Sequence, residues 1–239
     1  IDYRRDHSFR IPRPDQSDEY GTPNACTQCH DDKTNSWAAN VVKEWYGSER
    51  PAYFSDELLL STHEDLKPDE RSKLEEFIVD YKKPDIARAS VIENLNFTTE
   101  TDYQVLMRVL RDTSAIVKYQ ALMKFRPLPP EIRTTIALEH LKDSIKLVRV
   151  GAAQLVVGVD ENSFSAVDKI DLNKSIEELE TMLFSSADFS TGRMQLGDYY
   201  FEKGDFNKAI THYKMALQKD DLLIPVYSNL ATTYSILKD

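Results

Sequence analysis

Two stretches of this sequence repeat each other at an offset of 31 residues, and both carry apolar residues at helical spacing. One stretch, DTSAIVKYQALMKF, begins at Asp112, and the other, DSIKLVRVGAAQLVV, begins at Asp143. The alignment places Ala121 against Ala152, and a weaker third copy, PDIARASVIENL, begins at Pro84. A short amphipathic unit that recurs at a fixed period cannot bury its apolar face alone, so successive copies must stack. The repetition therefore predicts an array of packed helices.

Helix-like segments, YQVLMRVLR and EIRTTIALEHLK, lie between the copies, so each repeat is expected to be a pair of helices. A cation recurs at one position of the three copies, as Arg88, Lys118 and Arg149. Paired helices of this length, with small residues where they cross, resemble HEAT-type repeats over residues 84–160. The resemblance implies a curved stack of helix pairs, an α-solenoid.

A different repeat follows in the stretch LGDYYFEKGDFNKAITHYKMALQKD, which begins at Leu196. Its small and aromatic residues have the order and spacing of a 34-residue tetratricopeptide (TPR) repeat. We expect Gly197 and Ala209 to let two helices approach closely, and Tyr200 and Tyr213 to fill the groove between successive pairs. The resemblance covers residues 188–239, where one repeat is followed by the first helix of the next. Residues 161–187 then form a connector and a degenerate half repeat.

Composition agrees with a helical fold. The chain is 41% hydrophobic and 29% charged, which suits a globular protein, and its 7 glycines and 10 prolines leave few tight turns for a sandwich or barrel. Its net charge of −10 argues against a nucleic-acid or anionic-membrane binder, because both use basic faces. No run of 18 apolar residues exists, so we expect no membrane span.

Residues 1–34 show no helical period and contain three prolines and polar runs, so the sequence predicts an irregular, extended loop there. Residues 35–83 are predicted to form connecting helices. The first begins at Asn35, with Ser36 as its cap, and ends at Gly47. Two more are expected, over residues 56–61 and 68–81, the last opening with proline and acids as helix starts do.

The loop holds the only two cysteines of the chain, in the run ACTQCH, as Cys26 and Cys29 followed by His30. A disulfide closing two intervening residues would restrain little of the unfolded chain and would leave the histidine unexplained. A zinc site needs a second ligand pair, and a thioredoxin-like pair needs a βαβ setting. C-x-x-C-H is the signature of covalent haem attachment, in which both thiols form thioethers and the histidine binds the iron. This spacing favours haem c.

The sixth iron position calls for another ligand. All five methionines fall in the repeat helices, so histidine is favoured, and His7 is the nearest one in the same irregular segment. The alternative is an ordinary surface histidine in a basic run. Neighbouring arginines, Arg13 among them, either pair with haem propionates or are solvated.

The run from residue 4 to residue 47 resembles the last haem-binding stretch of multihaem c-type cytochromes that continue into HEAT-like and TPR repeats. The resemblance implies an exported, periplasm-facing bacterial electron-transfer protein, in which a histidine matching His7 is the distal ligand. It also implies further C-x-x-C-H motifs before Ile1. The chain begins without methionine or a signal sequence and stops inside a repeat, so we expect a segment of a longer protein.

Two functions follow from these features. The first is an electron carrier with haem c at Cys26, Cys29 and His30, working with a redox partner protein or with upstream haem domains. Loading of the haem depends on maturation outside the reducing cytoplasm. The second is a protein-binding scaffold without haem, which holds a peptide or partner on the concave face of the repeats. No catalytic constellation is visible in the sequence, so an enzyme activity of this segment itself is not expected.

Overall fold

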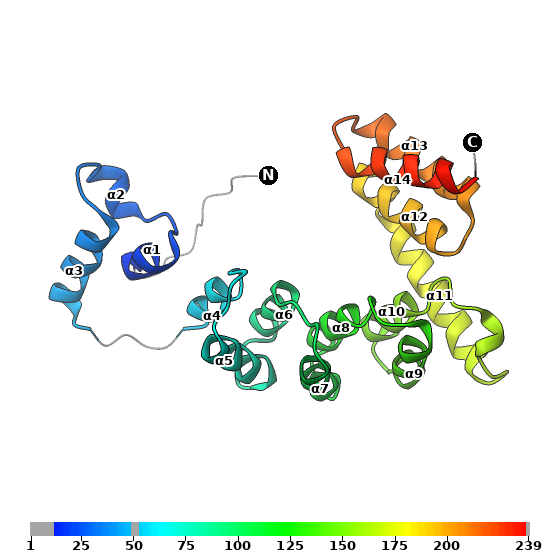
Figure 1. The fold of residues 1–239 in the computed structure, drawn as a ribbon, viewed down its shortest axis with the longest axis horizontal. Coiled ribbons are helices and arrows are strands. Elements are labelled where there is room, and N and C mark those ends of the chain that lie inside the picture. The colour runs from blue at the N-terminus through cyan, green and yellow to red at the C-terminus, as the bar shows by residue number, and fades with distance from the viewer. Residues whose placement is uncertain (1–11, 49–52, 238–239) are drawn as a thin grey trace. The chain divides into compact units, whose positions relative to one another are not determined.

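The structure is a computed structural model that describes residues 12–48 and 53–237, and it is helical throughout (Figure 1). Those residues form fourteen α-helices and one short 3₁₀ helix, with no strand among them, which confirms the predicted all-α class. The chain divides into two compact units, residues 1–83 and residues 84–239, which are described separately below.

The first unit contains two short helices where an extended loop was predicted. Its helices are α1 (Pro14–Tyr20), α2 (Ala25–Cys29), α3 (Asn35–Tyr46), α4 (Ser55–Leu60) and α5 (Pro68–Val79). The loop prediction is therefore wrong for Pro14–Tyr20 and Ala25–Cys29. Pro14 starts α1 at a position that suits its fixed φ, and Gly21 ends it in the left-handed region, at φ 68°. The buried residues of α1 include Gln16 and Ser17, so no apolar period announces this helix.

The remaining helices of the first unit follow the prediction closely, with one wrong cap. Helix α3 spans Asn35–Tyr46, but its N-cap is Thr34, whose hydroxyl accepts a hydrogen bond from the Trp37 N–H at 3.1 Å. Ser36 lies inside the first turn instead, and its hydroxyl donates to Asp18. Helix α5 begins at the expected proline and ends two residues before Tyr81. Arg13 fixes α1 to α4 through an ion pair with Asp56 at 3.1 Å.

The second unit begins with five helices, of which the first packs against the third and the third packs against the fifth. These are α6 (Asp85–Asn94), α7 (Glu100–Val109), α8 (Ala115–Lys124), α9 (Pro130–His140) and α10 (Lys146–Leu155). In Figure 1, α6, α8 and α10 follow one another in a row, with α7 and α9 beside it. Ala121 and Ala152, which the sequence aligns, are both fully buried on α8 and α10. Small side chains at these points let the helix backbones approach closely.

Ion pairs join successive copies of the aligned helices. The guanidinium of Arg88 on α6 pairs with Asp112 at 2.5 Å, and Lys118 on α8 pairs with Asp143. Each acid also fixes the turn before the following helix, because Asp112 accepts from the Ser114 N–H and Asp143 accepts from the Ile145 N–H, both at 2.8 Å, and Ser114 and Ile145 directly precede α8 and α10. The acids that open the second and third copies thus each fix the turn before their own helix and bind the cation of the copy before it.

The cation of the last copy, Arg149, has a glutamate as its partner instead of an aspartate. Arg149 on α10 makes two hydrogen bonds to the Glu178 carboxylate, at 2.9 and 2.5 Å. Glu178 belongs to the long helix α11 (Asp168–Ser185), which follows the short 3₁₀ helix η1 (Glu161–Ser163). Arg88, Lys118 and Arg149 therefore each join their own helix to the segment that follows it in the row.

Helices α12 (Ser190–Glu202), α13 (Phe206–Lys219) and α14 (Ile224–Leu237) complete the second unit. Ala209 and Tyr213 of α13 are buried and form a core cluster with Val226 of α14. The Tyr213 ring lies over Gly197, where an added Cβ would stand 2.3 Å from the ring. Absence of a side chain at Gly197 therefore permits the close approach of α12 and α13 that the sequence predicts.

Replacing Gly197 with alanine is expected to destabilise the second unit by about 1–3 kcal/mol, because the new methyl group would overlap the Tyr213 ring. The ring cannot easily move, since it is 1% exposed and its hydroxyl is hydrogen-bonded. Urea unfolding measures the loss. In a double-mutant cycle with Tyr213→Ala, the cost of the alanine at Gly197 should largely vanish. An equal cost in both backgrounds would show that the overlap is not its cause.

Candidate functional site

The C-x-x-C-H run forms a short helical turn, α2, whose start is fixed by Asn24. The side-chain oxygen of Asn24 accepts hydrogen bonds from the N–H groups of Cys26 and Thr27, at 3.0 and 3.1 Å. Its amide nitrogen donates to the side-chain oxygen of Asn35 at 2.8 Å, at the beginning of α3. Capping by asparagine stabilises an isolated turn that has little else to hold it. The motif is therefore a defined turn anchored to a longer helix.

Both thiols of the motif are free. Cys26 is half-buried and Cys29 is exposed, and no residue of α2 is buried. Because the two cysteines are three residues apart in a helical turn, their side chains lie on one face. No disulfide joins them, so both sulfurs are available to form bonds with another group.

His30 ends the turn. Its backbone N–H donates to the Cys26 carbonyl at 2.8 Å, while its imidazole is exposed beside Trp37, with ring centroids 5.1 Å apart. Within residues 12–48 and 53–237, the imidazole nitrogens make no hydrogen bond. The imidazole is thus held near the cysteines and is free to bind a metal.

These residues fit covalent haem on three counts: two unpaired thiols on one face, an unengaged imidazole next to them, and an open surface around the turn. The described residues contain no group of three or more histidine, cysteine or acidic side chains that could hold a metal ion. A haem iron does not require such a group, since the porphyrin itself supplies four ligands.

The other predicted ligand, His7, lies outside the residues that the structure describes. Arg13, for which a propionate or the solvent was expected as partner, is bonded within the protein to Asp15 and Asp56. These carboxylates raise the pKa of its guanidinium, so it remains charged. Arg13 therefore connects α1 to α4.

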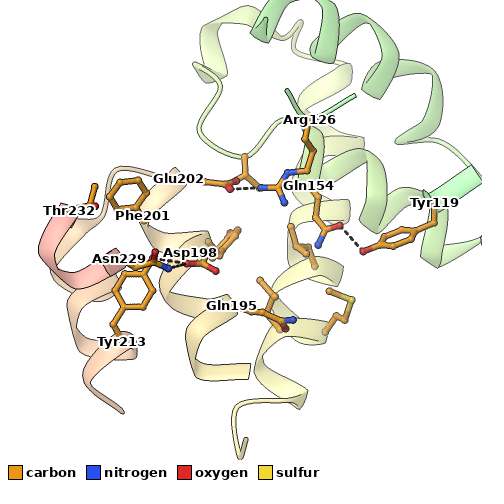
Figure 2. A pocket seen from close by; sticks show the side chains of 15 residues that line it. Tyr119, Arg126, Gln154, Gln195, Asp198, Phe201, Glu202, Tyr213, Asn229 and Thr232 are labelled. Carbon is orange, nitrogen blue, oxygen red and sulfur yellow. Dashed lines mark hydrogen bonds and ion pairs between the residues drawn. The ribbon is translucent and has the colours of Figure 1, made fainter. Parts of the chain in front are cut away.

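A second candidate site is a pocket of about 490 Å³ in the second unit (Figure 2). The residues that line it belong to α8, α10, α11, α12, α13 and α14 or lie just after α8 and α10. One wall is apolar, with Val157, Leu179 and Leu183 buried in it. At its edge, Arg126 forms an ion pair with Glu202, and the Tyr119 hydroxyl donates to Gln154 at 3.1 Å.

Asp198 is the acid at the centre of this pocket. One carboxylate oxygen, Oδ1, accepts hydrogen bonds from the Tyr213 hydroxyl at 2.7 Å and from the Asn229 amide at 2.9 Å. The other oxygen, Oδ2, has no hydrogen-bond partner among the described residues. Burial raises the pKa of Asp198 above its ordinary value, because both donors are neutral and do not offset the lost hydration. The carboxylate is therefore half-buried, with one oxygen open to the pocket.

Replacing Asp198 with asparagine is expected to make the second unit more stable at neutral pH. A raised pKa means that the neutral carboxyl contributes stability below the ordinary value of 3.8, which is lost as the pH rises through the raised pKa. Asparagine keeps an acceptor for Tyr213 without that loss. In urea unfolding between pH 4 and pH 7, the free energy of unfolding of the variant should increase relative to that of the wild type as the pH rises. A difference in the free energy of unfolding that is the same at every pH would contradict the raised pKa of Asp198.

The sequence did not point to Asp198, Arg126 or Gln154. The available signal was the position of Asp198, directly after the small residue Gly197 and among aromatic residues that face neighbouring helices. An acid in such a stretch must find donors or remain costly to bury. The pocket itself joins residues from Tyr119 to Thr232, a separation no local pattern reveals.

Comparisons of the sequence with protein-family models and with curated proteins, and of the fold with solved structures, find no match. Within the part of the chain that the structure describes, no helix combines the length and the apolar character needed to cross a bilayer.

Proposed function

We propose that this chain carries one covalent haem c at Cys26, Cys29 and His30 and acts in electron transfer. The observation that supports this most directly is the α2 turn, where two free thiols and an unengaged imidazole stand together on an open surface. A disulfide would use only the two thiols, and a zinc site would need a further ligand beside these three side chains.

Each residue of the motif has a defined part. The thiols of Cys26 and Cys29 would hold the porphyrin through thioether bonds, and His30 would supply an imidazole to the iron. Asn24 fixes the turn that presents the thiols, and Trp37 packs beside the His30 ring. When bound, the haem supplies an iron centre that is reversibly reduced by one electron.

The wider setting follows from the resemblance to multihaem cytochromes. Under this proposal the protein is exported to a periplasm-facing compartment, where the thiols meet the haem maturation apparatus. Its partners are a redox protein or haem domains of the same chain, with His7 as a distal ligand. The helices from α6 onward form a curved stack of HEAT-like and TPR helix pairs. The ion pairs from Arg88 to Glu178 and the packing of Tyr213 on Gly197 support that arrangement.

The optical spectrum of protein matured in an exporting host tests the proposal. We expect a sharp α-band on reduction that stays with the polypeptide through extraction with acidified acetone, because thioether bonds survive this treatment. A host without the maturation apparatus provides the control and should give colourless protein. Absence of the band from correctly exported protein would contradict the electron-carrier function.

Replacing His7 with alanine is expected to convert the low-spin spectrum of the loaded protein to a high-spin one, because the sixth iron position would lose its imidazole. Absorption spectra and the midpoint potential report the change. His140, on the buried side of α9 in the second unit, offers a control, and His140→Ala should leave both unaltered. An unchanged low-spin spectrum of the His7 variant would show that His7 does not bind the iron held at Cys26.

The pocket around Asp198 favours a second candidate function, a scaffold whose helical repeats bind a partner chain. Stacked helix pairs commonly present such surfaces. The two functions are compatible, because the haem motif and the pocket belong to different units of the chain.

A further inference from the structure

The pocket in the second unit contains an acid, Asp198, to which no cation is bonded among the described residues, although the charge of Arg126 acts on it through space. Arg126 is paired with Glu202, and Lys203 is paired with Glu180 at 3.5 Å. Asp198 has only neutral hydrogen-bond donors, Tyr213 and Asn229, and both bond to the same oxygen. The remaining oxygen therefore offers a strong acceptor to whatever enters the pocket.

Two other polar side chains of the pocket also have unused acceptor oxygens, while the amide groups of Gln154 and Gln195 can donate as well. The Asn229 amide nitrogen is used by Asp198, which leaves the side-chain oxygen of Asn229 without a hydrogen bond among the described residues. Gln195 at the mouth is exposed and makes no hydrogen bond within the same residues. Figure 2 shows Asn229 and Tyr213 on one side of Asp198, with Gln154 and Gln195 on the other. A ligand with several N–H donors would match these acceptors.

The apolar wall adds a second requirement. Val157, Leu179 and Leu183 are buried and can pack only against a hydrocarbon part of the ligand. Arginine and lysine side chains combine an apolar stem with a charged end that donates hydrogen bonds. Arginine fits better, because its planar group directs donors to more than one acceptor at once.

We propose that this pocket binds an arginine side chain presented by an extended segment of a partner protein, with the Asp198 carboxylate as its counter-ion. A partner chain, rather than a small molecule, is favoured because two of the residues that line the pocket, Gln195 of α12 and Thr232 of α14, are exposed, so a bound side chain can remain joined to a main chain outside. Its volume of about 490 Å³ suits one large side chain with its neighbours. The net charge of −10 attracts cationic segments.

This inference deepens the second candidate function and does not depend on haem. An array of end-capped nonapeptides with varied flanking residues and arginine at the centre provides the probe, together with a matched array that carries citrulline, the neutral isostere. The full chain is applied to both arrays, and the strongest peptides are titrated in solution. We expect the arginine peptides to bind at least about tenfold more tightly than their citrulline counterparts, the loss of one charge-assisted contact.

Two single-residue variants test whether Asp198 is the residue that selects arginine over citrulline. In Asp198→Asn the preference for arginine should fall to less than about twofold, while Asp188→Asn, which removes an exposed charge elsewhere in the same unit, should keep the wild-type preference. The citrulline comparison on the wild type stands even if the Asp198 variant folds poorly. Equal binding of arginine and citrulline peptides would overturn the inference and leave a scaffold without charge selectivity. Failure of every peptide to bind would overturn both. Binding of N-acetylarginine amide as tight as that of the best peptide would show a small-molecule site instead.

Discussion

Replacing Cys26 and Cys29 together with serine is expected to abolish covalent haem completely, while the helical fold of the first unit is retained. Both thiols are needed for the thioether bonds, yet neither side chain is buried, so the hydroxyl groups can take their place without disturbing a core. Haem-dependent staining after denaturing electrophoresis measures attachment, and far-ultraviolet circular dichroism measures the helix content.

Gln28→Ala is the matched control for this pair, because Gln28 lies inside the same turn, is exposed, and has no part in the motif chemistry. It should load haem like the wild type. If the double serine variant still carried covalent haem, the attachment would lie elsewhere. If the glutamine variant lost haem as well, the turn would be required as a shape rather than for its sulfurs.

Replacing Arg88 with methionine is expected to destabilise the packing of α6 against α8 by about 3–5 kcal/mol, because it leaves the largely buried Asp112 without its cation. The Arg88 side chain is 1% exposed and that of Asp112 is 10% exposed, so water compensates little. Burial by itself raises the pKa of Asp112, but the hydrogen bonds from Arg88 and from the Ser114 N–H, together with the charge of Arg88, outweigh it and hold the pKa below its ordinary value. The pair therefore contributes stability at neutral pH that is lost as the pH falls through that lowered pKa.

Native-state hydrogen exchange of the α6 and α8 amides measures this loss locally, without assuming that the whole chain unfolds in one step. Lys208→Met is the control, because Lys208 pairs with Asp205 at 2.9 Å on the surface, where water screens the pair, and its loss should leave the exchange of the α6 and α8 amides unchanged. Adding Asp112→Asn to the Arg88 variant should recover part of the stability. Equal effects of the buried and the surface substitutions would contradict the role given to the ion pairs.

Helices with a regular apolar pattern could be predicted from the sequence, and so could the contacts that recur with the repeat. The start of α5 at Pro68 and the end of α3 before Gly47 follow from local backbone chemistry. The burial of Ala121 and Ala152 follows from their alignment. Contacts that recur in each repeat can be predicted from the sequence, because every copy shows the same pattern of residues.

Helices α1 and α2 could not be predicted, because polar residues hold them. Gln16 of α1 is buried, and its amide donates to Asp56 at 2.8 Å across forty residues of sequence. Asn24 similarly orders α2 through Asn35. In the second unit, Asp198 of α12 becomes a candidate site only when Asn229 is brought to it from α14, two helices further along the chain. Long-range polar contacts of this kind leave no periodic signal.

The intact mass of the exported, matured protein tests the central claim most directly. The account predicts a polypeptide heavier by one haem, in which neither Cys26 nor Cys29 reacts with an alkylating reagent after denaturation. A mass equal to that of the bare polypeptide, with both thiols alkylated, would contradict it.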